Sequence, residues 1–169
     1  AQTFNSASPA ELAADYIDAE KGVETAEDAI NGAMDIIAEN ISDDADIRRR
    51  LRSLFTVAGV LRSRAADSEK ESVYTMYYEY DEPVNKIAGH RVLAVNRGEN
   101  EGFLKVGIDV DRIKALNIIN ANVLSDNGSA CTDTVRDAAA DAYDRLIFPS
   151  VEREIRNMIT DSAVESALK

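Results

Sequence analysis

The stretch that decides the fold spans residues 145–156 and reads Arg145-Leu146-Ile147-Phe148-Pro149-Ser150-Val151-Glu152-Arg153-Glu154-Ile155-Arg156. Apolar residues recur at helical spacing on both sides of Pro149: Val135, Ala138, Ala139, Ala142, Leu146 and Ile147 before it, and Val151, Ile155, Met158 and Ile159 after it. Pro149 lacks a backbone donor and disfavours a helical conformation for Phe148, and Ser150 can cap the helix that follows. The stretch therefore predicts two helices joined at a kink or a very short break.

Three further helices are predicted toward the N-terminus, because each has a recognisable first turn. Ser8 can cap the first of them, with Pro9 at the first helical position and Glu11 completing a capping box. Thr25, followed by acidic residues at 27 and 28, starts the second. Ser42, followed by two aspartates, caps the third, which ends at a glycine at position 59 and buries Ile47, Leu51, Leu54, Phe55 and Ala58.

The middle of the chain combines short helices with a little strand. Residues 103–110 alternate between apolar and other side chains and form the best strand candidate, and residues 60–65 are its plausible partner. Residues 67–80 end in a tyrosine cluster, which fits a helix face at the rim of a core or, alternatively, a surface that stacks on bases. Two short helices are expected around Gly89, and a helix ending near Val123 is expected to turn Ile113, Leu116, Ile119 and Val123 inward.

These patterns predict a mainly α fold, a bundle-like array of helices with at most a short two-stranded β ribbon that pairs residues 60–65 with 103–109. The expected divisions are an N-terminal helical hairpin or bundle (1–66), short helices with a strand (67–129) and a long kinked C-terminal helical pair (130–169). At 169 residues, these parts are expected to form one compact unit. Aromatic residues make up only 6%, so the core should consist mainly of Ala, Val, Ile and Leu.

Charge and composition limit the possible functions. The net charge is −12, which opposes binding to nucleic acid phosphates and anionic membranes. No apolar run is long enough to span a bilayer, and a single cysteine excludes an internal disulfide framework, so a reducing, cytoplasmic setting is expected. The first residues do not resemble a signal peptide, and the absence of an initiator Met suggests a piece excised from a larger protein.

The charge is unevenly distributed. Residues 1–46 contain twelve acidic residues and one lysine, whereas residues 47–66 contain six arginines and no acidic residue. This basic segment, with Arg48, Arg49, Arg52, Arg62 and Arg64, either pairs with the acidic helices beside it or contacts phosphates. The second interpretation gives candidate nucleic-acid contacts at those five arginines, together with Arg91 and Arg97.

The sequence does not indicate a catalytic or a metal-binding site. The one histidine, His90, lies where a helix is expected to start and has no nucleophile motif near it, so a structural role is favoured. The acidic run at 43–46 lacks the glycine and the closing glutamate of a calcium loop, and Cys131 has no basic neighbour to activate it. We therefore expect no enzyme activity, no metal and no cofactor.

Five segments in sequence order together resemble the Tex family of bacterial transcription accessory proteins: residues 16–23 (YIDAEKGV), 59–63 (GVLRS), 80–83 (YDEP), 89–94 (GHRVLA) with 97–99 (RGE), and 145–156 (RLIFPSVEREIR). Members of that family are several times longer than this chain. They carry an N-terminal helical region with helix-turn-helix character, an RNase-H-like domain, helix-hairpin-helix motifs and an OB-type RNA-binding domain. The resemblance implies that this chain is part of the N-terminal helical region.

The resemblance implies RNA or DNA binding by the parent protein and leaves the role of this segment open. One expectation is a non-catalytic scaffold that packs against adjacent domains through an apolar surface on the last helices, at Leu146, Pro149, Ile155 and Met158. A second is direct nucleic-acid contact through the basic segment 48–64. A third is recruitment of transcription machinery through the acidic helices at 9–46.

Overall fold

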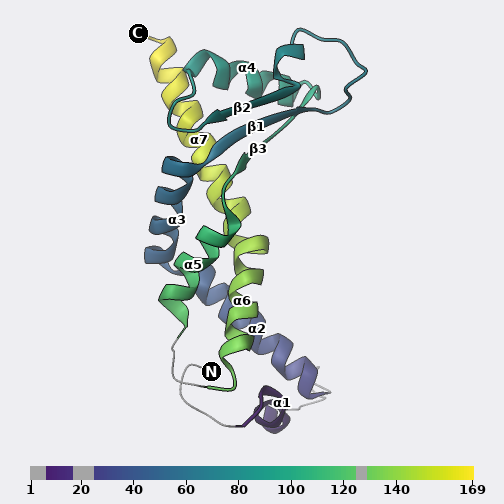
Figure 1. The fold of residues 1–169 in the computed structure, drawn as a ribbon, viewed down its shortest axis with the longest axis vertical. Helices are drawn as coiled ribbons and strands as arrows, with labels where there is room; N and C mark the ends of the chain where they lie inside the picture. The colour runs from purple at the N-terminus through teal and green to yellow at the C-terminus, as the bar shows by residue number, and fades with distance from the viewer. Residues whose placement is uncertain (1–6, 17–24, 125–128) are drawn as a thin grey trace. The chain divides into compact units, whose positions relative to one another are not determined.

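The computed structural model describes residues 7–16, 25–124 and 129–169, and within these ranges the chain is mainly helical, as predicted. Figure 1 shows the elements in chain order. They are α1 (Pro9–Ala13), the 3-10 turn η1 (Ala14–Tyr16), α2 (Ala26–Asp43), α3 (Ala45–Ala58), β1 (Val60–Ala65), the 3-10 turn η3 (Thr75–Tyr77), β2 (Glu79–Pro83), α4 (Gly89–Asn100), β3 (Leu104–Asp109), α5 (Arg112–Val123), α6 (Thr132–Asp141), the π-helical η4 (Ala142–Ile147) and α7 (Phe148–Ala167).

The first of two compact units combines Ala1–Arg49 with Ile113–Phe148. In it, α2 packs against α1, α6 and η4. Most of its buried apolar side chains are small or branched, with Tyr143 as a buried aromatic: Ala13, Ala38, Ile41, Ile47, Ala115, Ile119, Val135, Ala138, Ala139, Ala142 and Ile147. This composition confirms the predicted aliphatic core, and the alanines of α6 allow α2 to approach closely. One residue expected inward, Ile113, is 70% exposed.

The predicted helix starts are confirmed in two cases and shifted in the third. Ser8 and Glu11 form a reciprocal capping box at α1, and Thr25 forms one with Asp28 at α2. At α3 the capping residue is Asp44 rather than Ser42, since Asp44 Oδ1 accepts hydrogen bonds from the backbone N–H groups of residues 46 and 47 at 2.9 and 3.0 Å. Ser42 instead lies in the last turn of α2.

The second compact unit combines Arg50–Arg112 with Pro149–Lys169 and contains a three-stranded antiparallel sheet in the order β2-β1-β3. The predicted pairing of β1 with β3 is confirmed, with Ser63 opposite Val106. The predicted limit of two strands was wrong, because β2 pairs with the other edge of β1 and places Tyr80 opposite Ser63. β2 escaped prediction because it is short, contains three carboxylates and ends in a proline.

Alternation along β1 separates a buried face of the sheet from an exposed one. Leu61 and Ser63 are 2% and 0% exposed, whereas Arg62 and Arg64 point to the opposite side. The Ser63 hydroxyl donates to the carbonyl of Tyr77 at 2.8 Å. Tyr74 and Tyr77 are themselves buried, which confirms the core interpretation of the tyrosine cluster, although only the short turn η3 is helical there.

One helix, α4, replaces the two short helices expected around Gly89. Gly89 begins this helix instead of separating two. It lies so close to α7 that a Cβ atom there would be 3.1 Å from the Cα of Ala163. A glycine that looked like a break in the sequence is therefore explained by the close approach of two helices.

The helical segment continues through Pro149 without the very short break that was one of the two predicted alternatives, and the kink stays a prediction. Phe148 has helical dihedral angles, with φ −54° and ψ −51°, and its N–H donates to the carbonyl of Tyr143, five residues earlier. This wider π turn joins α6 to α7 without interruption, and Pro149 is the second residue of α7. Ser150 therefore lies inside a helix and does not cap one.

Two glycines in helices give a matched test of packing. At Gly98 a Cβ atom would lie 2.5 Å from Leu104 Cδ1 and 3.0 Å from a ring carbon of Tyr74, whereas at Gly32 nothing lies within 4 Å. We expect Gly98→Ala to lower the free energy of unfolding by about 1–3 kcal/mol through overpacking. Gly32→Ala should raise it by about 0.5–1 kcal/mol through helix propensity alone.

Urea unfolding followed by circular dichroism measures both changes. If both variants were stabilised equally, the packing of Leu104 and Tyr74 against Gly98 would be contradicted.

Candidate interaction surfaces

The arginines of the basic segment that lie on α3 make contacts within the chain. Arg48 is half-buried and donates to the backbone carbonyl and, at 3.2 Å, to the hydroxyl of Ser42. Arg49 forms an ion pair with Asp46, one turn earlier on the same helix. Arg52 reaches Glu154 of α7 at 3.3 Å. These side chains neutralise or satisfy neighbouring groups instead of forming a patch of free charge.

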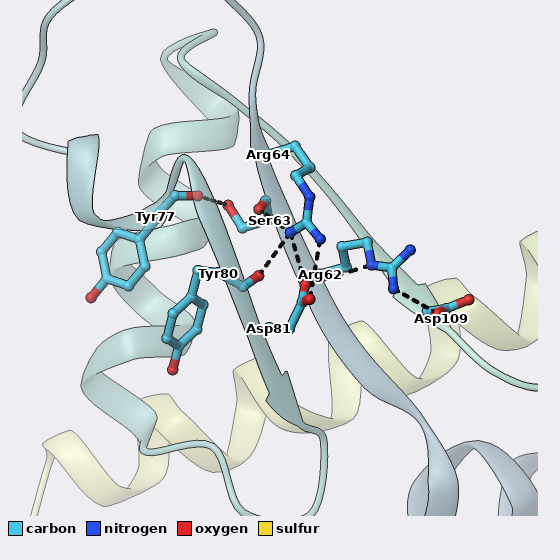
Figure 2. Close-up of polar contacts among 7 residues, drawn as sticks. All are labelled: Arg62, Ser63, Arg64, Tyr77, Tyr80, Asp81 and Asp109. Atoms are coloured by element: carbon cyan, nitrogen blue, oxygen red, sulfur yellow. Dashed lines mark hydrogen bonds and ion pairs between the residues drawn. The ribbon is translucent and has the colours of Figure 1, made fainter. Parts of the chain in front are cut away.

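On the exposed face of the sheet, two arginines share one aspartate. Arg64 donates to both oxygens of Asp81 at 2.8 and 3.1 Å, and Arg62 lies 3.5 Å from Asp81 and 2.9 Å from Asp109. Figure 2 shows this chain of contacts running across all three strands. The cross-strand pairs thus tie β2 and β3 to the central strand.

The shared aspartate titrates below its ordinary range. The hydrogen bond from Arg64 lowers the pKa of the Asp81 carboxyl from 3.8, partial desolvation opposes this shift, and the charges of Arg64 and Arg62 add to the lowering. The same hydrogen bond raises the pKa of Arg64. Both shifts favour the ionised pair, so the exposed face holds its charges in place.

A hollow lies beside this network, over the one position of the sheet face that lacks a side chain. Gly107 is opposite Arg62 in the register, and the hollow around it has a volume of about 390 Å³. Arg62, Arg64 and Lys105 supply cations at its rim and Asp109 supplies a carboxylate. Sequence analysis missed Lys105, which only the strand register brings next to the two arginines.

The two remaining predicted contacts lie on α4. Arg91 donates to the Tyr80 hydroxyl at 3.1 Å and lies 3.8 Å from a carboxylate oxygen of Glu82, whereas Arg97 is exposed. The seven predicted arginines are therefore distributed over two helices and a strand, with Arg48 and Arg49 in the first unit and the other five in the second.

A second polar cluster, which sequence analysis did not identify, joins α7 to α4 and β3. Arg156 donates to both oxygens of Glu99 at 2.9 and 2.5 Å, to Asn96 Oδ1 at 2.9 Å and to the Val106 carbonyl at 3.5 Å. One turn earlier, Glu152 accepts the N–H of Ile108 at 3.0 Å. Arg156 and Glu152 belong to the predicted helical stretch 145–156, in which the apolar spacing gives a local signal but the partners of the charged residues lie far away in sequence.

An open groove of about 480 Å³ lies above this cluster. Asn96, Glu99 and Asn100 of α4 line one wall, and residues of α7 between Pro149 and Thr160 line the other. Its lining is predominantly polar, with asparagine, glutamate and arginine side chains. The groove can therefore bind a ligand that offers both hydrogen-bond donors and acceptors.

The residues predicted to pack against other domains are not equally available. Pro149 and Met158 are exposed and Leu146 is half-buried, but Ile155 is only 2% exposed. Ile155 is therefore already covered in the described structure. For all four residues, interdomain packing stays a prediction.

The described residues offer no evident catalytic constellation. His90 is exposed near the start of α4, and Cys131 is buried just before α6. Over 7–16, 25–124 and 129–169, no group of three or more His, Cys, Asp or Glu side chains is placed to hold a metal ion. In the same ranges no helix has the length and apolar character needed to cross a membrane.

Comparison with known proteins identifies the family. The chain matches the family described as Tex central region-like over residues 5–169. It is 42% identical to the uncharacterized protein YdcI of Bacillus subtilis over 90% of this chain and 22% of that protein. It is 32% identical to the transcriptional accessory protein Tex of Neisseria gonorrhoeae over 52% of this chain and 12% of that protein. It is 26% identical to the human S1 RNA-binding domain-containing protein 1 over 88% of this chain and 16% of that protein.

Fold and contacts define a mainly helical module in which Arg62, Arg64 and Arg156 pair with carboxylates of the same unit. The chain belongs to the Tex family, through the region described as Tex central region-like. The family prediction is confirmed, and the matched region is named central, whereas the resemblance had suggested the N-terminal helical region. The chain spans about a fifth or less of the length of these three relatives.

The Arg156 cluster should be a main source of stability in the second unit. Arg156→Ala leaves Glu99 without its partner in a partly buried site, and we expect the free energy of unfolding to fall by about 2–3 kcal/mol. Arg156→Lys keeps the charge but cannot make the forked contacts, so it should also destabilise. Arg153→Ala, at an exposed site three residues away, should change stability by at most about 0.5 kcal/mol. Urea unfolding of all three variants tests this prediction, and equal effects of R153A and R156A would contradict it.

The pKa of Asp81 predicts a pH dependence. Because that pKa is lower in the folded state, the pair with Arg64 stabilises the fold above the ordinary aspartate value and loses this contribution as pH falls through the folded value. The stability difference between the wild type and Asp81→Asn should therefore be largest at neutral pH and shrink below about pH 4. An Arg64→Ala background should remove most of this pH dependence. A difference that stayed constant down to pH 2.5 would rule out the ion pair as its cause.

Proposed function

We propose that the chain is a non-catalytic helical module of a larger Tex-type transcription accessory protein, in which it positions neighbouring nucleic-acid-binding domains in the cytoplasm. The main support for this proposal is the Arg156–Glu99 cluster. In it, charged side chains of α4 and α7 bind each other within the module. Side chains that hold a sheet edge and two helices together serve the rigidity of a module. They are not available for chemistry on a substrate.

The relatives support this role. Two of the three relatives are named as a transcriptional accessory protein and as an S1 RNA-binding domain-containing protein, and all three are much longer than the chain. Nucleic-acid binding by the whole protein is therefore expected, with RNA or DNA contacted by parts other than this one. The net charge of −12 agrees, since this region by itself opposes phosphate binding.

A direct contact with nucleic acid through the sheet is the second candidate function. The hollow over Gly107 favours it, because Arg62, Arg64 and Lys105 surround a space that could admit a phosphate. The ion pairs of both arginines with Asp81 and Asp109 weigh against it, since a phosphate would have to compete with carboxylates already in place.

The third candidate function is recruitment of another protein through the acidic helices. Glu27 and Asp35 of α2 are exposed, and the neighbouring Ile36 is 62% exposed. A pull-down of transcription machinery that does not change when Glu27 and Asp35 are both replaced by Lys would count against this role.

Fluorescence anisotropy distinguishes the first two functions. We expect no binding of this chain to labelled single-stranded RNA or duplex DNA, even at low salt where electrostatic attraction is least screened. Micromolar, salt-sensitive binding would contradict the scaffold proposal. Its loss in Arg62→Ala and Lys105→Ala would locate the contact at the sheet, whereas its loss in Arg49→Ala and Arg52→Ala would locate it on α3.

A further inference from the structure

The geometry of the groove between α4 and α7 follows from three contacts between these helices. Gly89 of α4 lies against Ala163 of α7, where even a methyl group would be tightly packed. Farther along both helices, Asn96 Nδ2 donates to Thr160 Oγ1 at 2.9 Å and Glu99 binds Arg156. The helices are therefore antiparallel, close at Gly89, and bridged by long side chains toward Asn100, where the groove holds its volume.

The polar groups of the groove fall into two sets. Asn96, Glu99 and Arg156 are occupied with one another and form a fixed floor. Among the residues that the structure describes, the side chains of Asn100, Arg153 and Asn157 line the same groove and have no hydrogen-bond or ion-pair partner. Two carboxamides and a guanidinium thus remain available above a rigid floor.

A carboxamide offers a donor and an acceptor side by side, which matches the N–H and C=O groups of a peptide main chain. Arginine adds donors for a further carbonyl. Recognition through the main chain requires an extended segment, because the main-chain groups of a helix are already bonded to one another. The exposed ring of Pro149 gives such a segment an apolar contact at the wide end of the groove.

The charges of the groove disfavour a nucleic acid. Glu99 and Glu152 balance Arg153 and Arg156, and among the described residues no aromatic side chain on which a base could stack lines the groove. The volume of about 480 Å³ is within the range of ligand-binding clefts. The ligand that matches the groove is therefore neutral and has alternating hydrogen-bond donors and acceptors.

We propose that the groove between α4 and α7 binds an extended polypeptide segment through its main chain, with Asn100 and Asn157 pairing with peptide units from opposite walls. This inference rests on the proposed scaffold role and names the chemistry of its partner. The groove would let the module hold a neighbouring polypeptide without strong dependence on that polypeptide's sequence.

NMR titration with an acetylated and amidated Thr-Ala-Thr-Ala-Thr-Ala peptide tests the proposal. We expect shifts of the side-chain NH₂ signals of Asn100 and Asn157 that saturate at millimolar peptide. Asn100→Ala and Asn157→Ala should each weaken binding about three- to tenfold. Asn117→Ala, at an exposed asparagine of α5 outside the groove, should leave binding unchanged. The same peptide with alternate main-chain nitrogens methylated should not bind.

Three outcomes would overturn the inference. The first is an absence of shifts at Asn100 and Asn157, and the second is equal binding by the methylated peptide. The third is a saturable change in the chemical shifts of the same two signals when an oligouridine is added, which would make the groove a nucleic-acid site. Oligonucleotide binding that moves signals near Lys105 instead would contradict the scaffold role and leave the groove proposal standing, so the two failures can be told apart.

Discussion

The second unit depends on how the outer edge of β3 is satisfied. A sheet edge presents unpaired backbone groups, and here α7 covers them with side chains one turn apart: Glu152 accepts the N–H of Ile108, and Arg156 donates to the Val106 carbonyl. Because Arg156 also binds Glu99, the same helix is fixed to α4. One pair of oppositely charged residues at i and i+4 thus sets the arrangement of sheet, α4 and α7.

The sequence allowed the helices to be predicted where a local signal exists. Ser8 with Glu11 and Thr25 with Asp28 are capping patterns that involve only neighbouring residues, and both form as expected. β2 was missed because the pattern of Glu79–Pro83 is mostly charged, and its strand character comes from pairing with β1. Gly89 and Pro149 were misjudged because their effects depend on Ala163 and on a π turn, neither of which is visible in the local sequence.

In the candidate sites, too, local sequence features could be predicted, whereas contacts between distant residues could not. The arginines were recognised as a charged segment, but whether an arginine is free or paired depends on carboxylates that are distant in sequence, such as Asp81 for Arg64 and Glu154 for Arg52. Alternation in β1 then turns Arg62 and Arg64 to the exposed face, where pairing leaves little net charge. Lys105 and the groove residues Asn100 and Asn157 could not be identified without the pairing of strands and helices that brings them together.

The π turn at η4 also sets the phase of the C-terminal helical segment. Ala139, Tyr143 and Ile147 are buried at intervals of four residues across η4, where an α-helix advances by 3.6 residues per turn. The extra residue in the π turn accounts for this slower repeat. Within the first unit, the length of η4 consequently decides whether Ile147 lies on the same side of the helical segment as Ala139. Loss of one residue from η4 would rotate Ile147 by about 100° away from the buried side that Ala138 and Ala139 share.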